Sequence, residues 1–114
     1  MSFTLATWYI NSVRLREALV HKLMQEEAPD VLCLQECKSP VDKIPLDGFN
    51  ALGYTHMIAR GQKGYNGVAI LSRLPITEVG SHDFADLGHA RHIAGQLDNG
   101  VTLHNFYVPA GGDV

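Results

Sequence analysis

The stretch "LATWYINSVR", from Leu5 to Arg14, sets an apolar and aromatic run directly before polar side chains. The run Phe3–Trp8 is typical of a buried strand, and the Asn11-Ser12 pair ends it. Ser12 is a favourable residue for the N-cap of a helix. The stretch therefore predicts a strand that leads directly into a helix, with polar groups at the junction.

An amphipathic helix is predicted from Val13 to Glu27. Its apolar residues recur at helical spacing, and charged residues take the other positions. The predicted buried stripe consists of Leu15, Leu19, Val20, Leu23 and Met24. Pro29 disfavours helical backbone at Ala28 and so ends the pattern.

The run "VLCL", Val31–Leu34, is apolar without interruption, which is typical of a strand covered on both faces. A strand, a helix and a second strand in so short a stretch predict a βαβ unit with parallel strands. The segment Ser39–Leu52, which contains proline and glycine, favours short helical turns and loop.

The second half of the chain is dominated by strand patterns with turn residues between them. The predicted strands are Tyr54–Ala59, Val68–Ser72, Ile76–Gly80, Arg91–Leu97 and Val101–Tyr107. Asn99-Gly100 is a strong hairpin signal. These elements predict an α/β fold. A sheet of this size with one long helix would leave an apolar face open, which favours association.

The composition predicts one globular domain. The chain has 114 residues, of which 46% are hydrophobic and 18% charged, and its formal net charge is −3. This charge excludes a uniformly basic nucleic-acid coat but allows a local basic cleft. We expect no leader peptide and no membrane segment. Cys33 and Cys37 are too few for a disulfide framework or a zinc site, which favours a reducing cytoplasm.

Glu36 and Lys38 directly follow the predicted strand Val31–Leu34. The carboxyl ends of such strands are where ligands bind in open α/β sheets, and one carboxylate there suits Mg²⁺. Asn11 and Arg14 follow the neighbouring strand and should lie at the same edge, with Arg14 and the helix amides able to hold a phosphate. The alternative is a solvated loop acid, a capping Asn and a surface Arg.

Two further segments have alternative interpretations. The loop Gly61–Gly67, with Lys63, could contact a nucleic-acid backbone or simply form a glycine-rich hairpin. Tyr107 could donate a hydrogen bond to a phosphate or pack at the edge of the core. For the histidines, including His89, His92 and the "SHD" at 81–83, we expect surface roles, because no nucleophile or three-ligand set accompanies them.

Taken in order, these segments resemble the exonuclease III-type apurinic/apyrimidinic endonucleases of the endonuclease/exonuclease/phosphatase family. The segments that carry the resemblance are "ATWYINSVRLR", "PDVLCLQECK", "GQKGYNGVAILS", "ARHI" and "YVPAGG". The resemblance implies a four-layer α/β sandwich, in which two packed mixed sheets are flanked by helices. Residues 1–114 would be the N-terminal portion of that domain, with the C-terminal part missing.

The resemblance also implies roles for individual residues. Glu36 matches the family's metal-binding glutamate, and Asn11 matches a polar position beside the metal and the scissile phosphate. Tyr107 matches an active-site tyrosine. Arg14 matches a phosphate-contacting basic residue, and Lys38 lies close to the metal position. Arg91 and the loop that contains Lys63 match structural or DNA-facing positions. Arg14, Lys38, Lys63 and Arg91 are therefore the expected contacts to DNA phosphate. The implied reaction is Mg²⁺-dependent hydrolysis of a DNA phosphodiester, with Mn²⁺ as an alternative metal.

The implied substrate is double-stranded DNA with abasic sites or 3′ ends, and the implied role is DNA repair.

Two departures from the family pattern matter. Tyr9 stands where the family has Asn, and in tightly packed surroundings the bulky phenol should impair activity. The family's "G-D-x-N" segment and its late Asp-His pair, expected after this region, do not occur in this sequence.

The sequence therefore leaves more than one function open. The first is the N-terminal part of a repair nuclease, monomeric when whole and inactive as this chain alone. The second is a non-catalytic half-domain that associates with itself. A phosphoesterase of the same superfamily acting on lipid or nucleotide phosphates is a minor third possibility.

Overall fold

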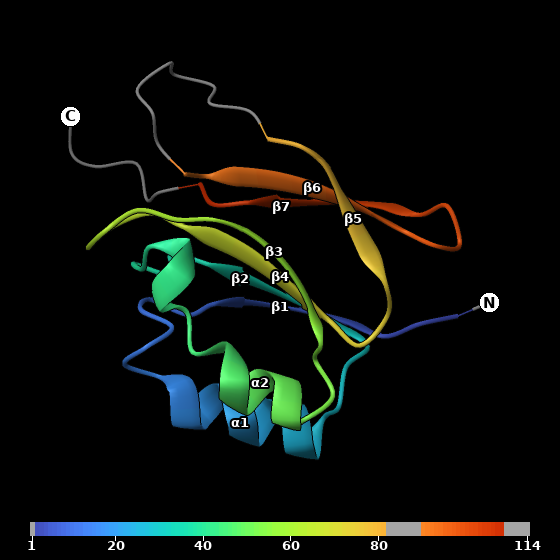
Figure 1. The fold of residues 1–114 in the computed structure, drawn as a ribbon, viewed down its shortest axis with the longest axis horizontal. Coiled ribbons are helices and arrows are strands. Elements are labelled where there is room, and N and C mark those ends of the chain that lie inside the picture. Colours follow the sequence, from blue (N-terminus) through green and yellow to red (C-terminus); the bar gives the residue numbers. More distant parts are fainter. Residues whose placement is uncertain (1, 82–89, 109–114) are drawn as a thin grey trace.

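The computed structural model describes residues 2–81 and 90–108. Figure 1 shows these residues as three layers, with the helices on one face of a first sheet and a second sheet on its other face. Within the described residues, none of the helices is long and apolar enough to span a membrane.

The predicted strands are all confirmed, with boundaries that shift by up to two residues. The elements are β1 Leu5–Tyr9, α1 Glu17–Glu26, β2 Val31–Gln35, the 3₁₀ helix η1 Val41–Lys43, α2 Leu46–Ala51, β3 His56–Arg60, β4 Val68–Ser72, β5 Ile76–Gly80, β6 His92–Leu97 and β7 Thr102–Phe106. The predicted helical turns between β2 and β3 are η1 and α2.

The strands form two sheets. Sheet A has the order β1-β2-β4-β3, in which β1 and β2 are parallel, as predicted, and the other pairs are antiparallel. Sheet B has the antiparallel order β5-β6-β7. The two packed sheets implied by the resemblance are therefore confirmed. The open face expected from the strand patterns alone is wrong, because sheet B covers the face of sheet A that the helices leave free (Figure 1).

The central strands β2 and β4 of sheet A are buried on both faces, which explains their uninterrupted apolar runs. One core lies between this sheet and the helices, with Val20, Met24, Leu32, Leu34, Phe49 and Leu71 among its buried residues. A second core lies between the two sheets and contains Val31, Cys33, Val68, Ile70, Ile93 and Leu97. Cys33 and Cys37 are free, buried thiols, and burial raises the pKa of Cys33 to about 11.

The predicted helix begins too early, and part of its predicted buried stripe is exposed. Helix α1 begins at Glu17, and Leu15 and Leu19 are 77% and 51% exposed, whereas Val20 and Met24 are buried. Before the helix, Ser12 has a left-handed φ of 86°, and residues 13–16 form turns rather than α-helix. The amides of Ser12 and Val13 donate to the carbonyls of Glu36 and Cys37, which holds this segment against the chain after β2.

Asn105 on β7 fastens sheet B to sheet A. Its side-chain amide Nδ2 donates to the carbonyls of Leu34 and Ala69 at 3.0 and 2.8 Å, and its Oδ1 accepts from Gln35 Nε2 at 2.8 Å. All hydrogen bonds of this amide group are made to β2 and β4, in the buried space between the sheets.

Gly95 on β6 permits the close approach of the two sheets. A Cβ at this position would lie 2.5 Å from Ile58 Cδ1 and 2.7 Å from Ile76 Cδ1. Gly95→Val should therefore lower the free energy of unfolding by about 1–3 kcal/mol, because the sheets must move apart. Urea unfolding followed by circular dichroism measures this.

Gln96→Val is the matched control, since Gln96 is exposed on the same strand and should change the free energy by less than about 0.5 kcal/mol. Equal destabilisation by the two variants would contradict the proposed packing.

Candidate active site

The chain segments that follow β1 and β2 run side by side at one edge of sheet A. The amide of Ile10 donates to the Gln35 carbonyl at 3.0 Å, and that of Ser12 to the Glu36 carbonyl at 2.9 Å. Parallel pairing of β1 and β2 brings their carboxyl ends together. The predicted proximity of the Asn11 and Glu36 segments is confirmed.

This edge has strained backbone. Asn11, Ser12, Glu36 and Lys38 all have left-handed φ, at 50°, 86°, 57° and 53°. Such a conformation costs a non-glycine residue about 1–3 kcal/mol and is concentrated at functional sites. The strain aims the side chains that follow β1 and β2, which an ordinary loop would not require.

The Glu36 carboxylate is buried and only partly satisfied. Lys38 Nζ lies 3.2 Å from Glu36 Oε1, while Oε2 is buried without a hydrogen-bond partner among the described residues. An unpaired buried carboxylate oxygen is costly, and a hydrated divalent cation would satisfy it. The residues present therefore fit Mg²⁺ or Mn²⁺, although within the described ranges no three His, Cys, Asp or Glu gather as a metal cluster.

Tyr107 lies beside Glu36 at the end of β7. Partial burial and the Glu36 carboxylate raise the pKa of Tyr107, while the charge of Arg91 opposes this shift. The phenol therefore stays protonated at neutral pH and can donate a hydrogen bond. The structure therefore places Tyr107 beside Glu36 with Arg91 nearby, while the roles expected of these residues stay predictions.

Tyr9 packs on this site from β1. Its ring centroid lies 5.7 Å from that of Tyr107, at an interplanar angle of 48°. Within this chain the side chain of Tyr9 is 53% exposed, so the described residues do not crowd it. The effect expected of Tyr9 on activity stays a prediction.

Arg91 is held by an amide network that the sequence did not reveal. Arg91 Nε donates to Asn66 Oδ1 at 3.2 Å, and Asn66 Nδ2 donates to Gln62 Oε1 at 2.8 Å. The amide of Lys38 donates to the Asn66 carbonyl at 2.8 Å. Asn66 thus connects the Glu36 segment to Arg91. The signal available in the sequence was the Asn66-Gly67 pair, and in the structure Asn66 has a left-handed φ of 55°.

Arg14 and Lys63 lie further out. Arg14 precedes α1, so the prediction that it lies in the first helical turn is wrong, and it is exposed beside Leu15 and His21. Arg16 instead donates to the Asn11 carbonyl at 2.6 Å. Lys63 is exposed in the loop between β3 and β4. Neither side chain is brought against Glu36 by a described contact.

The histidines lie elsewhere. His92 Nε2 is 3.1 Å from His104 Nδ1, and both rings stack with Phe106 on sheet B. His92 is only 8% exposed, so the expected surface role is wrong for this residue. His82, Asp83 and His89 lie outside the described residues, so the structure does not test their predicted roles.

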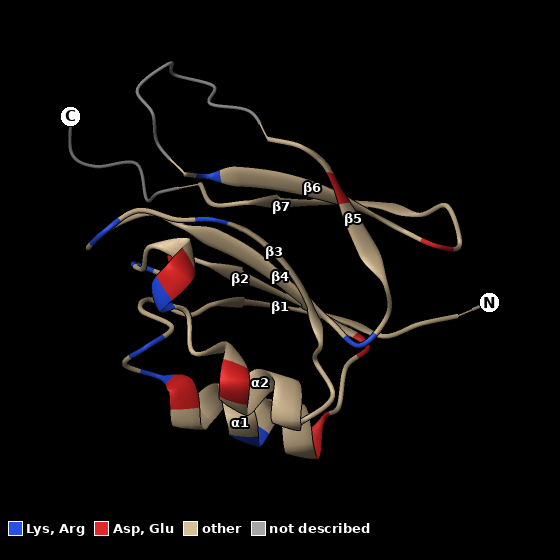
Figure 2. Ribbon diagram, in the orientation of Figure 1, with Lys and Arg blue, Asp and Glu red and all other residues tan. Residues whose placement is uncertain are grey.

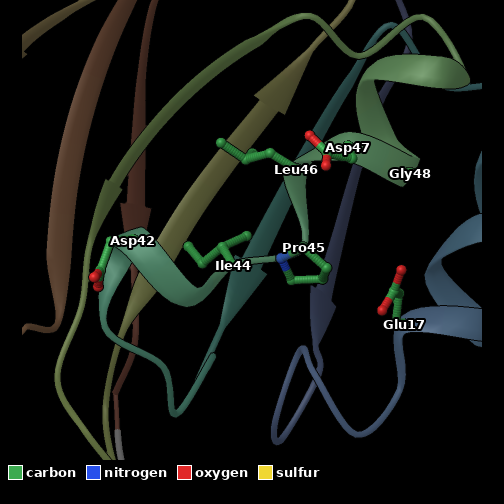
Figure 3. A pocket seen from close by; sticks show the side chains of 7 residues that line it. All are labelled: Glu17, Asp42, Ile44, Pro45, Leu46, Asp47 and Gly48. Atoms are coloured by element: carbon green, nitrogen blue, oxygen red, sulfur yellow. The ribbon is translucent and has the colours of Figure 1, made fainter.

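Charge is unevenly distributed in the described part of the chain. Figure 2 shows several Lys and Arg segments at the end of the molecule where β3 ends and β6 begins. A hollow of about 410 Å³ between α1 and α2 has the opposite character, because Glu17, Asp42 and Asp47 line it with Ile44, Pro45, Leu46 and Gly48 (Figure 3). Carboxylates would repel a phosphate there, so the Glu36 edge is the better candidate for a phosphate site.

Comparison with known proteins identifies the family to which this fold and this edge belong. A model of the endonuclease/exonuclease/phosphatase family matches residues 6–113, and the chain belongs to this family. It is 38% identical over 64 residues to exodeoxyribonuclease III of Haemophilus influenzae, and 36% identical over 95 residues to recombination repair protein 1 of Drosophila melanogaster. These matches cover 56% and 80% of the chain.

Solved structures of an AP endonuclease and a 3′ phosphatase also resemble this chain. An AP endonuclease from Archaeoglobus fulgidus superposes with a TM-score of 0.83 at 34% identity over 95% of this chain. A Neisseria 3′ phosphatase bound to a product DNA hairpin gives 0.81 at 36% identity over 93%. The chain spans 24% and 14% of the two curated relatives, and 42% and 41% of the two solved chains.

The environment of Tyr107 can be tested by titration in metal-free buffer. Glu36→Gln should lower the pKa of Tyr107, because a neutral neighbour no longer repels the phenolate. Arg91→Gln should raise it, because a favourable positive charge is lost. Carbon NMR of ring-labelled tyrosine measures both shifts, and Tyr107→Phe assigns the signal. An unchanged Tyr107 pKa in Glu36→Gln would show that the side chains of Glu36 and Tyr107 do not lie beside each other.

Proposed function

We propose that this chain is the N-terminal part of a DNA-repair nuclease that hydrolyses phosphodiesters at abasic sites or 3′ ends. The observation that carries the proposal is the buried Glu36 Oε2, which has no partner among the described residues and lies beside Lys38 and Tyr107. The relatives named exodeoxyribonuclease III and AP endonuclease support it. The cytoplasm is the proposed location, in keeping with two buried free thiols.

Each residue of the site has a proposed part in the reaction. Glu36, with Asn11, holds Mg²⁺ or Mn²⁺. When bound, the cation stabilises negative charge on the scissile phosphate. The protonated Tyr107 donates a hydrogen bond to a phosphate oxygen, and Lys38 holds the Glu36 carboxylate in place.

The DNA backbone is proposed to lie across the basic end of the molecule seen in Figure 2. Arg91, which Asn66 orients, would contact phosphate nearest the site. Lys63 and Arg14, which are exposed, would contact phosphates farther along the duplex. Because the contacts are mainly to phosphate, binding should weaken as salt concentration rises.

A second candidate function is a non-catalytic half-domain that keeps DNA affinity and associates with itself. The observation that favours it is Tyr9, whose exposed phenol replaces the amide expected beside the metal. The 114-residue chain alone is proposed to be inactive, and a longer protein containing it to be a monomer.

Glu36 can be tested in a chimera in which residues 1–114 replace the matching segment of the Haemophilus exodeoxyribonuclease III. Glu36→Gln should reduce Mg²⁺-dependent incision of an abasic duplex by about a hundredfold or more, because charge stabilisation of several kcal/mol is lost. Glu26→Gln, at an exposed position on α1, is the control and should keep full activity. Equal activity of both variants would contradict the metal assignment.

Tyr9 gives a separate prediction in the same chimera. Tyr9→Asn should raise the rate of incision, because it supplies an amide at the rim of the site without disturbing a packed core. Tyr9→Phe should not, since it keeps the ring and supplies no amide. A rate for Tyr9→Asn at or below that of the parent chimera would show that the tyrosine is not the impairing residue.

A further inference from the structure

Two side-chain amides and a guanidinium form a chain of hydrogen bonds between the β3–β4 loop and the residues just before β6. Gln62 Oε1 accepts from the backbone amide of Ala90 at 2.7 Å and from Asn66 Nδ2 at 2.8 Å. Asn66 Oδ1 in turn accepts from Arg91 Nε at 3.2 Å. The chain therefore runs from a backbone amide, through two side-chain amides, to a cation.

The orientation of both side-chain amides follows from the first hydrogen bond of this chain. The backbone N–H of Ala90 can only donate, so Gln62 must present its oxygen to it. That oxygen can only accept, so Asn66 must present Nδ2 to Gln62. Asn66 Oδ1 then faces Arg91, whose guanidinium has donors only. Donors and acceptors therefore match in a single arrangement, and removal of either amide would break it.

The backbone around the chain is held independently of these side chains. The amide of Gly67 donates to the Ala90 carbonyl at 2.7 Å, and the amide of Tyr107 donates to the Arg91 carbonyl at 2.7 Å. Asn66 is buried, with 5% of its surface exposed. The side chains of Gln62 and Asn66 are therefore not needed to place the backbone of Arg91, and what they fix is the direction of its guanidinium.

Asn66 bonds the inner nitrogen of the guanidinium and thereby sets the plane of the group. Neither Nη group of Arg91 donates a hydrogen bond to a described residue. Two parallel Nη donors match two oxygens of one phosphate. The group lies near the Glu36 edge, since the charge of Arg91 opposes the rise in the Tyr107 pKa that burial and Glu36 cause. The outer fork of Arg91 is thus arranged for an anion beside Tyr107.

We propose that Gln62 and Asn66 are positioning residues, which hold Arg91 so that its two Nη groups bind the oxygens of one phosphate beside Tyr107. Gln62 anchors Asn66 to the backbone, and Asn66 orients the guanidinium. Without either amide Arg91 keeps its charge but populates several rotamers, and the phosphate must then order it at a cost in affinity. That this phosphate belongs to DNA rests on the proposed function, whereas the positioning of Arg91 does not.

Inorganic phosphate is the probe, titrated into metal-free residues 1–114 with isotope-labelled arginine while NMR follows the Arg91 Nε–H signal. Arg91→Gln assigns this signal by its loss. The signal should shift saturably with phosphate. Gln62→Ala and Asn66→Gly should each raise the phosphate dissociation constant by about threefold to tenfold, because preorganisation of one long side chain is lost. Asn66→Gly removes the amide and keeps the left-handed backbone without strain.

Gln62→Glu is the conservative variant, because a carboxylate oxygen still accepts both hydrogen bonds. Exchange of the Arg91 Nε proton with solvent should stay slow in Gln62→Glu and become fast in Gln62→Ala. Gln25→Ala is the matched control, since it removes an exposed amide on α1 and should change neither the exchange nor the phosphate affinity.

Two results would overturn the inference. One is an Arg91 signal that does not respond to phosphate in the parent chain. The other is the same phosphate affinity in the parent, Gln62→Ala and Asn66→Gly. Failure of the proposed function is distinguishable, because incision by the chimera that persists in Glu36→Gln would contradict the nuclease site while leaving phosphate binding by Arg91 intact.

Discussion

The amide of Asn105 is the constraint on which the rest of the structure depends. It is the point at which sheet B is hydrogen-bonded to the buried centre of sheet A, through Leu34, Ala69 and Gln35. A buried amide with all these bonds made is stabilising, but one with a missing partner is costly. Sheet B is therefore fixed in one register over β2 and β4.

That register determines where the functional side chains lie. Tyr107 follows Asn105 by two residues, and its backbone amide donates to the Arg91 carbonyl at 2.7 Å. With β7 fixed over β2, the phenol comes beside Glu36, which directly follows β2. The site is thus a consequence of the packing of sheet B on sheet A.

Much of this was predictable from the sequence, because strand patterns and turn residues are local. Glu36, Lys38 and Asn11 were placed at one edge by the rule that ligands bind at the carboxyl ends of strands, whereas Tyr107 was assigned to the site only through the family resemblance. The local strand patterns could not predict how the strands divide between two sheets, since that depends on contacts such as those of Gly95 with Ile58 and Ile76. The start of α1 was also missed, because Ser12 has a left-handed φ and the turns after it are held against a segment more than twenty residues away. The exposure of Tyr9 and the Asn66 network likewise depend on how distant strands meet.

The proposed metal site has Glu36 Oε2 as a ligand. Mn²⁺ titration of residues 1–114, followed by the electron paramagnetic resonance signal of the free ion, measures this directly. We expect one site, displaced by Mg²⁺, whose dissociation constant rises at least about tenfold in Glu36→Gln, a change of about 1.4 kcal/mol. Equal Mn²⁺ binding by the two proteins would contradict it.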